Sequence, residues 1–286
     1  MDEHAMRVAV ILPAAGRSRR FGGQAKLEVE LAGRAVLLRA VDLFAKRPEV
    51  SEVIIAADPD GLDAFKLRWG DQLGFLGVKV VAGGRAERWE TVQKAIDAVS
   101  DEATHIAVHD AARPVADAQM IKRVFAAAMK FEAVIPAVPV TATIKRLGEK
   151  AEVPAESADP LDAILGEAGK EEIEAWQVMQ TVPREGLWMV QTPQVFKADL
   201  LRRAYQQVSN GTLATDQITD DAGLVEAMGQ QVVAVMGDPM NVKITVPEDV
   251  PFAEAVLRVH RAGAAGGEDA LGGKRKFPTW AESDED

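Results

Sequence analysis

Short apolar runs alternate with helical patterns along the first half of the chain, and this alternation limits the possible folds more than any other feature. A run at Val8–Leu12 precedes a helical pattern at Val36–Phe44, and a run at Val53–Ala57 precedes one at Leu62–Trp69. The later segments, in order, are Val78–Val81, Thr91–Val99, Ile106–Val108, Met120–Met129 and Val134–Ala137. Strands that alternate with helices are typical of βαβ units. The sequence therefore predicts an α/β fold, with a mostly parallel twisted sheet and helices on both faces.

Charge argues against whole classes of partner. The 286 residues include 33 Lys and Arg against 44 Asp and Glu, a net charge of −11. Nucleic acids and anionic membranes both need a positive protein surface, so we expect neither as a partner. No cysteine is present, and no signal peptide or membrane span is visible, which predicts a protein of the reducing cytoplasm.

The acidic residues gather in two segments. Residues 147–178 hold nine acids against two lysines, and residues 262–286 hold six acids against three basic residues. We interpret 147–178 as an insertion that carries a short helix at Leu161–Trp176. The glycine-rich segment 262–286 has too little apolar surface to offset its chain entropy and is predicted to be a disordered tail. The rest of the chain is close to neutral and can carry a local basic site.

The loop after the first predicted strand has the character of a phosphate-binding loop. Between Pro13 and Lys26 it contains four basic residues and no acid. Gly16 allows backbone N–H groups to turn toward an anion, and Arg20 and Lys26 can neutralise its charge. A flexible basic surface loop remains the alternative interpretation of this segment alone.

Polar residues also follow later strands, where ligands bind in open α/β sheets. Asp110 is an oxygen ligand suited to Mg²⁺ and Arg113 a partner for phosphate, although Asp110 could instead cap a helix and pair with Arg113. Lys243 lies in an apolar, strand-like run at 241–245 and has either a functional role or a structural salt bridge.

Seven blocks of sequence, in order, resemble the 2-C-methyl-D-erythritol 4-phosphate cytidylyltransferases of the non-mevalonate isoprenoid pathway. The blocks are Pro13–Gly16 with Arg20 and Lys26, Gly83–Val92, Val108–Pro114, Thr143–Lys145, Gln191–Phe196, Ile218–Ala222, and Asn241–Thr245 with Pro247–Asp249. The resemblance implies a Rossmann-like nucleotidyltransferase fold. It further implies a cytidylyltransferase domain at 1–261, in which residues 138–196 form a β-arm for dimerisation and acceptor binding that carries the 147–178 insertion.

The resemblance also implies an activity and a set of site residues. CMP would pass from CTP to a sugar-alcohol phosphate with release of pyrophosphate, in a homodimer that requires Mg²⁺ or another divalent cation. Catalysis would fall to Arg20, Lys26 and Lys243, and CTP binding to Pro13, Ala14, Ala15, Gly16, Gly83, Gly84, Arg88 and Thr91. The positions matched to the acceptor are Asp110, Arg113, Thr143, Arg184, Thr192 and Thr219, with Asp110 also the metal ligand.

Two alternatives remain open at this point. A ribitol 5-phosphate cytidylyltransferase would use the same triphosphate loop with a different acceptor. A non-catalytic nucleotide-binding scaffold would work through the acidic insertion and tail, but it would not need cations at separate strand ends such as Arg20, Lys26 and Lys243.

Overall fold

The computed structural model describes residues 6–16, 21, 26–151, 174–214 and 218–265. The strands in these residues are β1 (Val8–Ala14), β2 (Glu30–Leu31), β3 (Arg34–Ala35), β4 (Val50–Ala57), β5 (Val78–Ala82), β6 (His105–Val108), β7 (Ala133–Pro139), β8 (Ile144–Lys150), β9 (Trp176–Val182), β10 (Trp188–Val190), β11 (Gln194–Lys197) and β12 (Val233–Met236). The helices are α1 (Val36–Asp42), α2 (Leu62–Phe75), α3 (Arg88–Ile96), α4 (Ala118–Ala128), α6 (Ala198–Ser209), α7 (Asp221–Ala227) and α8 (Asp249–Ala265), with a 3-10 turn, η2, at Pro59–Gly61.

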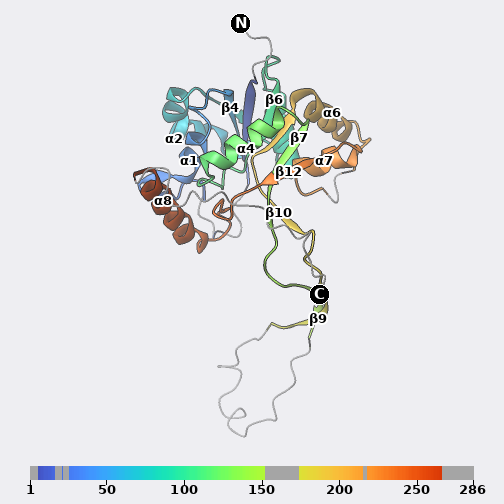
Figure 1. The fold of residues 1–286 in the computed structure, drawn as a ribbon. Helices are drawn as coiled ribbons and strands as arrows, with labels where there is room; N and C mark the ends of the chain where they lie inside the picture. The colour runs from blue at the N-terminus through green and yellow to red at the C-terminus, as the bar shows by residue number, and fades with distance from the viewer. Residues whose placement is uncertain (1–5, 17–20, 22–25, 152–173, 215–217, 266–286) are drawn as a thin grey trace, which may run out of the picture. The chain divides into compact units, whose positions relative to one another are not determined.

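The central sheet has the strand order β10-β7-β11-β6-β1-β4-β5, with β12 paired to β7 (Figure 1). β1 runs parallel to both β4 and β6, β4 is parallel to β5, and β12 is parallel to β7. The prediction of a mostly parallel sheet is confirmed. The strand β11 differs, because it lies antiparallel between β6 and β7.

Both faces of this sheet are buried, which explains why its strands are continuous apolar runs rather than alternating ones. In β1 the side chains of Val8, Val10 and Leu12 join a core with α1, α2 and α4. Ala9 and Ile11 join a second core with α3, α6 and α7. Helices therefore cover both faces, as predicted.

The chain divides into two compact units. The described residues within Met1–Val138 and Val190–Thr279 form the first, and those within Pro139–Met189 form the second. In the second unit β8 and β9 pair as an antiparallel hairpin. Most of the 147–178 insertion and nearly all of the 262–286 tail lie outside the described residues; the helix predicted inside the insertion is contradicted at its end, where Trp176 begins β9.

Two further expectations differ from the structure. The run at 241–245 is not a strand, because its backbone meets the rest of the protein through isolated hydrogen bonds rather than a ladder. The helix predicted at Leu62–Trp69 is longer in the structure, where α2 continues to Phe75, which is 91% exposed. Among the described residues, no helix is both long and apolar enough to span a membrane.

His105, at the start of β6, is buried in a neutral form. Its Nε2–H donates to the carbonyl of Ala128 at 3.1 Å, so its Nδ1 accepts from the hydroxyl of Thr104 at 2.8 Å. Burial, together with the nearby charge of Lys197, lowers the pKa of His105 to about 4. Protonation in the folded state is therefore costly.

We expect His105 to make the fold sensitive to mild acid. The pKa of His105 in the folded protein lies below its unfolded value of about 6.5. The contribution of neutral His105 to the free energy of unfolding is therefore complete above about pH 6.5. It is lost as the pH falls toward 4, by about 3 kcal/mol at most. His105→Gln removes this titration and keeps a donor for Ala128. Urea unfolding at pH 7 and pH 4.5 should show a smaller pH-dependent loss in the variant. An unchanged loss would assign the sensitivity to other groups, such as His109.

Candidate active site

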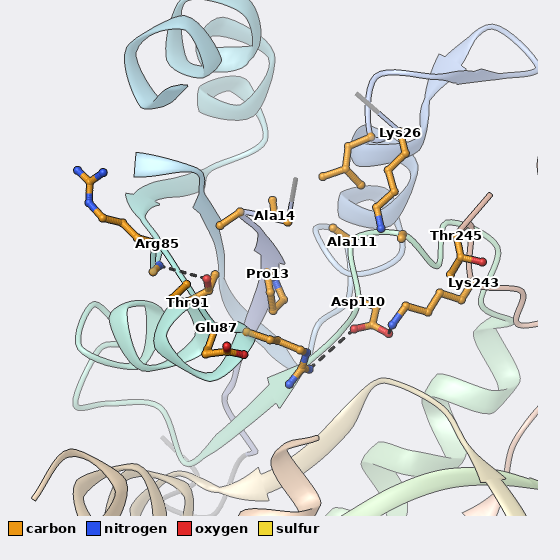
Figure 2. A pocket seen from close by; sticks show the side chains of 17 residues that line it. Pro13, Ala14, Lys26, Arg85, Glu87, Thr91, Asp110, Ala111, Lys243 and Thr245 are labelled. Atoms are coloured by element: carbon orange, nitrogen blue, oxygen red, sulfur yellow. Dashed lines mark hydrogen bonds and ion pairs between the residues drawn. The ribbon is translucent and has the colours of Figure 1, made fainter. Parts of the chain in front are cut away.

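A cleft of about 720 Å³ opens at the carboxyl ends of β1, β5 and β6 (Figure 2). Its lining comes from segments far apart in the sequence: Pro13–Gly16, Lys26, Leu27, Gly84–Arg88, Thr91, Asp110–Ala112, Lys243 and Thr245. Parallel strands place their carboxyl ends at one edge of the sheet, which is why loops separated by many residues converge here. The prediction that ligands meet the chain at these strand ends agrees with the position of the cleft.

The loop after β5 depends on two glycines. A Cβ on Gly83 would lie 2.9 Å from the Thr91 side chain, and a Cβ on Gly84 would overlap the side chain and backbone of Glu90. Gly84 N–H donates to the Thr91 hydroxyl at 3.1 Å, while the Glu90 carboxylate accepts from the amides of Arg85 and Ala86. These bonds close the loop tightly against the start of α3.

Asp110 is the acidic centre of the cleft. Its carboxylate lies 2.9 Å from Lys243 Nζ, 3.4 Å from Arg113 Nε and 3.8 Å from Arg88 Nη2. Burial by itself would raise the pKa of Asp110, but Lys243, Arg88 and Arg113 together hold it well below its ordinary value. The carboxylate is therefore ionised, and Lys243, with 41% of its side chain exposed, faces the cleft beside it.

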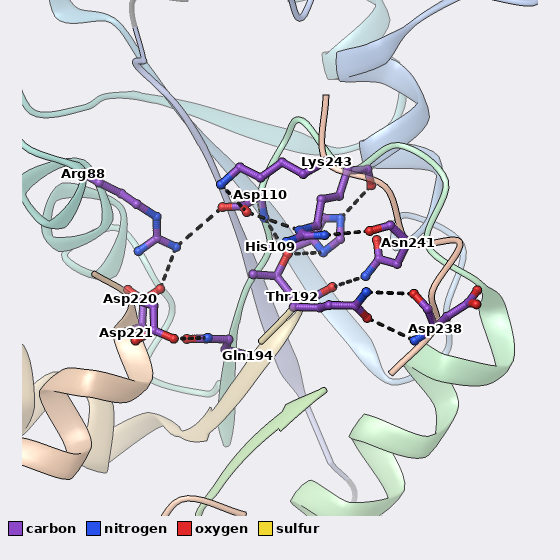
Figure 3. A network of polar contacts seen from close by, with 12 residues as sticks. Arg88, His109, Asp110, Thr192, Gln194, Asp220, Asp221, Asp238, Asn241 and Lys243 are labelled. Carbon is purple, nitrogen blue, oxygen red and sulfur yellow. Dashed lines mark hydrogen bonds and ion pairs between the residues drawn. The ribbon is translucent and has the colours of Figure 1, made fainter. Parts of the chain in front are cut away.

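A chain of hydrogen bonds holds Asp110 from behind (Figure 3). Asp110 N–H donates to the Thr192 hydroxyl at 3.0 Å, and that hydroxyl donates to His109 Nδ1 at 3.1 Å. His109 Nε2–H in turn donates to the carbonyl of Arg113 at 3.0 Å. Burial lowers the pKa of His109 to about 4, so the ring stays neutral. Thr192, predicted to bind the acceptor, is buried and is not among the residues that line this cleft; its hydroxyl accepts from Asp110 N–H.

Two backbone contacts bring Lys243 to the cleft. Ile244 N–H donates to the carbonyl of Ala112 at 2.8 Å, and Arg113 Nη1 donates to the carbonyl of Asn241 at 2.6 Å. The side chain of Asn241 donates to the carbonyl of Thr192 at 2.9 Å. The loop that carries Lys243 is thus tied to the loop that carries Asp110, and Arg113 is engaged in this framework behind the cleft lining.

The start of α7 contains a buried acidic residue to which the sequence analysis gave no role. Asp221 is fully buried and pairs with Arg88 Nη2 at 2.7 Å. Its only signal in the sequence was its place inside the block Ile218–Ala222, where we assigned a role to Thr219 alone. Thr219 itself is exposed and does not line the cleft.

The remaining predicted residues are distributed as follows. Arg20 lies outside the described residues. Thr143 and Arg184 belong to the second unit, in which both are exposed and Arg184 donates to the carbonyl of Thr141. Within the first unit the structure brings Pro13, Ala14, Ala15, Gly16, Lys26, Gly84, Arg88, Thr91, Asp110 and Lys243 to one cleft.

The residues of the cleft suit a divalent cation that is held mainly by the phosphates of a bound substrate. In the part of the chain that the structure describes, no group of three or more His, Asp or Glu residues could hold a metal by itself. Mg²⁺ commonly takes one or two carboxylates and completes its shell with waters and substrate phosphates. Asp110, ionised and at the wall of the cleft, fits that mode of binding.

A Rossmann-like sheet with cations and the ionised carboxylate of Asp110 around a cleft at its carboxyl edge defines a class of α/β protein suited to phosphorylated ligands. Comparison with known proteins narrows this class. The family model for 2-C-methyl-D-erythritol 4-phosphate cytidylyltransferase matches residues 8–160 and 161–259, and the chain belongs to this family.

Individual relatives agree with the family match. Proteins of that name from Frankia casuarinae and Symbiobacterium thermophilum are 39% and 40% identical over 254 and 252 residues, which cover 88% and 87% of this chain and 81% and 92% of theirs. The crystal structure of the Thermus thermophilus protein is similar with a TM-score of 0.63 at 30% identity, over 88% of this chain and 100% of that one.

Proposed function

We propose that the cleft transfers CMP from CTP to 2-C-methyl-D-erythritol 4-phosphate, giving 4-diphosphocytidyl-2-C-methyl-D-erythritol and pyrophosphate. The observation that supports this most is the convergence of Lys26, Lys243 and Asp110 on one cleft from three distant parts of a chain in this family. Cations around the ionised carboxylate of Asp110 suit a triphosphate that arrives with its metal ion.

The reaction needs electrostatic help more than proton transfer. An oxygen of the acceptor phosphate forms a bond to the α-phosphorus of CTP, and the bond from that phosphorus to the bridging oxygen breaks, so that its electron pair leaves with pyrophosphate. The acceptor phosphate is already ionised at pH 7, so no general base is required. Lys26 and Lys243, with Arg20, would neutralise the charge that gathers on the phosphate oxygens.

The metal ion would be held by Asp110 and by the triphosphate, and when bound it supplies further neutralisation of phosphate charge. Gly83, Gly84, Thr91 and Pro13–Gly16 would enclose the nucleotide, and all of these except Gly83 line the cleft. Arg113 and Thr192 would act by holding Asp110 and Lys243 in place.

The remaining acceptor contacts are proposed from the family. Thr143 and Arg184 of the Pro139–Met189 unit, with Thr219, would bind the acceptor, Arg184 gripping its phosphate through the fork of its guanidinium. We propose that this unit is the arm of a homodimer. A monomeric mass in solution, measured by light scattering on the active protein, would contradict the dimer.

Pyrophosphate release tests the proposed function directly. With CTP and 2-C-methyl-D-erythritol 4-phosphate the purified chain should turn over, and with ribitol 5-phosphate it should be at least 10²-fold less efficient, because a site shaped for one polyol leaves polar groups unpaired with another. Exhaustive chelation should abolish turnover, and added Mg²⁺ should restore it. Turnover that survives chelation would remove Asp110 as a metal ligand, and preference for ribitol 5-phosphate would overturn the acceptor.

A further inference from the structure

The two acids at the start of α7 have separate partners (Figure 3). Asp220 caps the helix by accepting from Gly223 N–H at 3.0 Å, and it also accepts from the Gln194 side chain at 2.7 Å. Asp221 accepts instead from the hydroxyl of Tyr205 and from Arg88 Nη2, at 2.7 Å from the latter. Asp220 therefore accounts for the helix start, and Asp221 is left with a different role.

A fully buried carboxylate is retained only when it is well paired. Asp221 and Tyr205 are both 0% exposed. Burial raises the pKa of Tyr205, and Asp221 raises it further, so the hydroxyl stays protonated and donates. Burial alone would lower the pKa of Arg88, but Asp221 and Asp110 raise it above its ordinary value. The guanidinium is therefore charged and bound to Asp221.

Arg88 connects this buried pair to the cleft. It is the first residue of α3 and lines the cleft, whereas neither Asp221 nor Tyr205 does. Its Nη2, which binds Asp221, also lies 3.8 Å from Asp110 Oδ1. Lys243 approaches the other oxygen of the same carboxylate. Arg88 and Lys243 thus flank Asp110, and Asp221 holds Arg88 in its position.

We propose that Asp221 and Tyr205 are positioning residues for the transfer reaction, which hold the Arg88 guanidinium at the wall of the cleft beside Asp110, where it donates to anionic oxygens of the phosphate substrates. The proposal rests on the proposed function, because it assigns how one cation of that site is held. An arginine that is free to move would lose side-chain entropy on binding phosphate, whereas an arginine already held by Asp221 does not.

A double-mutant cycle on kcat/KM tests the proposal, with pyrophosphate release from CTP and 2-C-methyl-D-erythritol 4-phosphate as the assay. Arg88→Ala should lower kcat/KM by about 10²-fold, and Asp221→Asn by about 10-fold or more. In the Arg88→Ala background, Asp221→Asn should cost less than about twofold, because its effect acts through Arg88. Glu226→Gln removes an exposed carboxylate from the same helix and should change nothing in either background.

A purely structural role for Asp221 would give losses that multiply, since damage to α6 and α7 would not depend on Arg88. Multiplying losses, or a folded Asp221→Asn protein with wild-type kcat/KM, would overturn the proposal. If Asp221→Asn does not fold by circular dichroism, Tyr205→Phe, which keeps the buried ring, replaces it in the cycle under the same two criteria. Failure of the wild-type protein to turn over would instead contradict the proposed function itself.

Discussion

Replacing Lys243 by alanine is expected to lower kcat by about 10²–10³-fold while the protein stays folded. Lys243 Nζ lies in the cleft, 2.9 Å from Asp110, where charge would develop on the α-phosphate oxygens, and losing one such preorganised contact typically has this effect. The side chain is 41% exposed, and Asp110 keeps Arg113 and Arg88 as partners, so stability should fall by only about 1–2 kcal/mol.

Lys79 provides a matched control for this variant. Lys79 lies on β5, outside the lining of the cleft, and 52% of its side chain is exposed. Its Nζ pairs with the Glu52 carboxylate at 2.6 Å. Lys79→Ala should lose one ion pair and keep wild-type kcat. Steady-state kinetics and thermal unfolding of the two variants compare the effects directly. A Lys243→Ala protein whose kcat stays within about threefold of wild type would show that this cation does not face the reacting phosphate.

A methyl group at position 84 should weaken nucleotide binding. In Gly84→Ala the new Cβ would overlap the Glu90 side chain and lie 2.9 Å from the Glu90 carbonyl carbon. The loop would have to move away from Thr91 and α3, and displacements of about 1 Å in a site can cost about 10²-fold. We expect kcat/KM for CTP to fall by about 10–100-fold, with most of the loss in KM.

Gly70→Ala is the corresponding control, because a Cβ at Gly70, inside α2, meets nothing within 4 Å. It should leave the kinetics unchanged and stabilise the protein by about 0.5–1 kcal/mol through helix propensity. Calorimetric titration of CTP into each variant measures the difference. Equal CTP affinity in Gly84→Ala and Gly70→Ala would mean that the loop after β5 does not contact the nucleotide.

The class of fold and the edge of the sheet that carries the site followed from the sequence. Continuous apolar runs such as Val53–Ala57 are typical of a mostly parallel sheet that helices cover on both faces, and β4 is such a strand. Because parallel strands end at one edge, the polar residues after them, including Asp110, had to meet there. These inferences needed only local periodicity, and the structure confirms the sheet and brings these residues to the cleft.

Which polar residues face the cleft, and which support it from behind, depended on the tertiary structure. Thr192 and Arg113 are as polar as Thr91 and Arg88, yet the first two turn into the framework that holds Asp110 while the latter two line the cleft. Asp221 shows the same limit, because its partner Arg88 lies 133 residues away and no local pattern marks the pair. Residue type and spacing specify where a loop begins, whereas the direction of each side chain is set by the distant groups that satisfy its hydrogen bonds and charge in the folded protein.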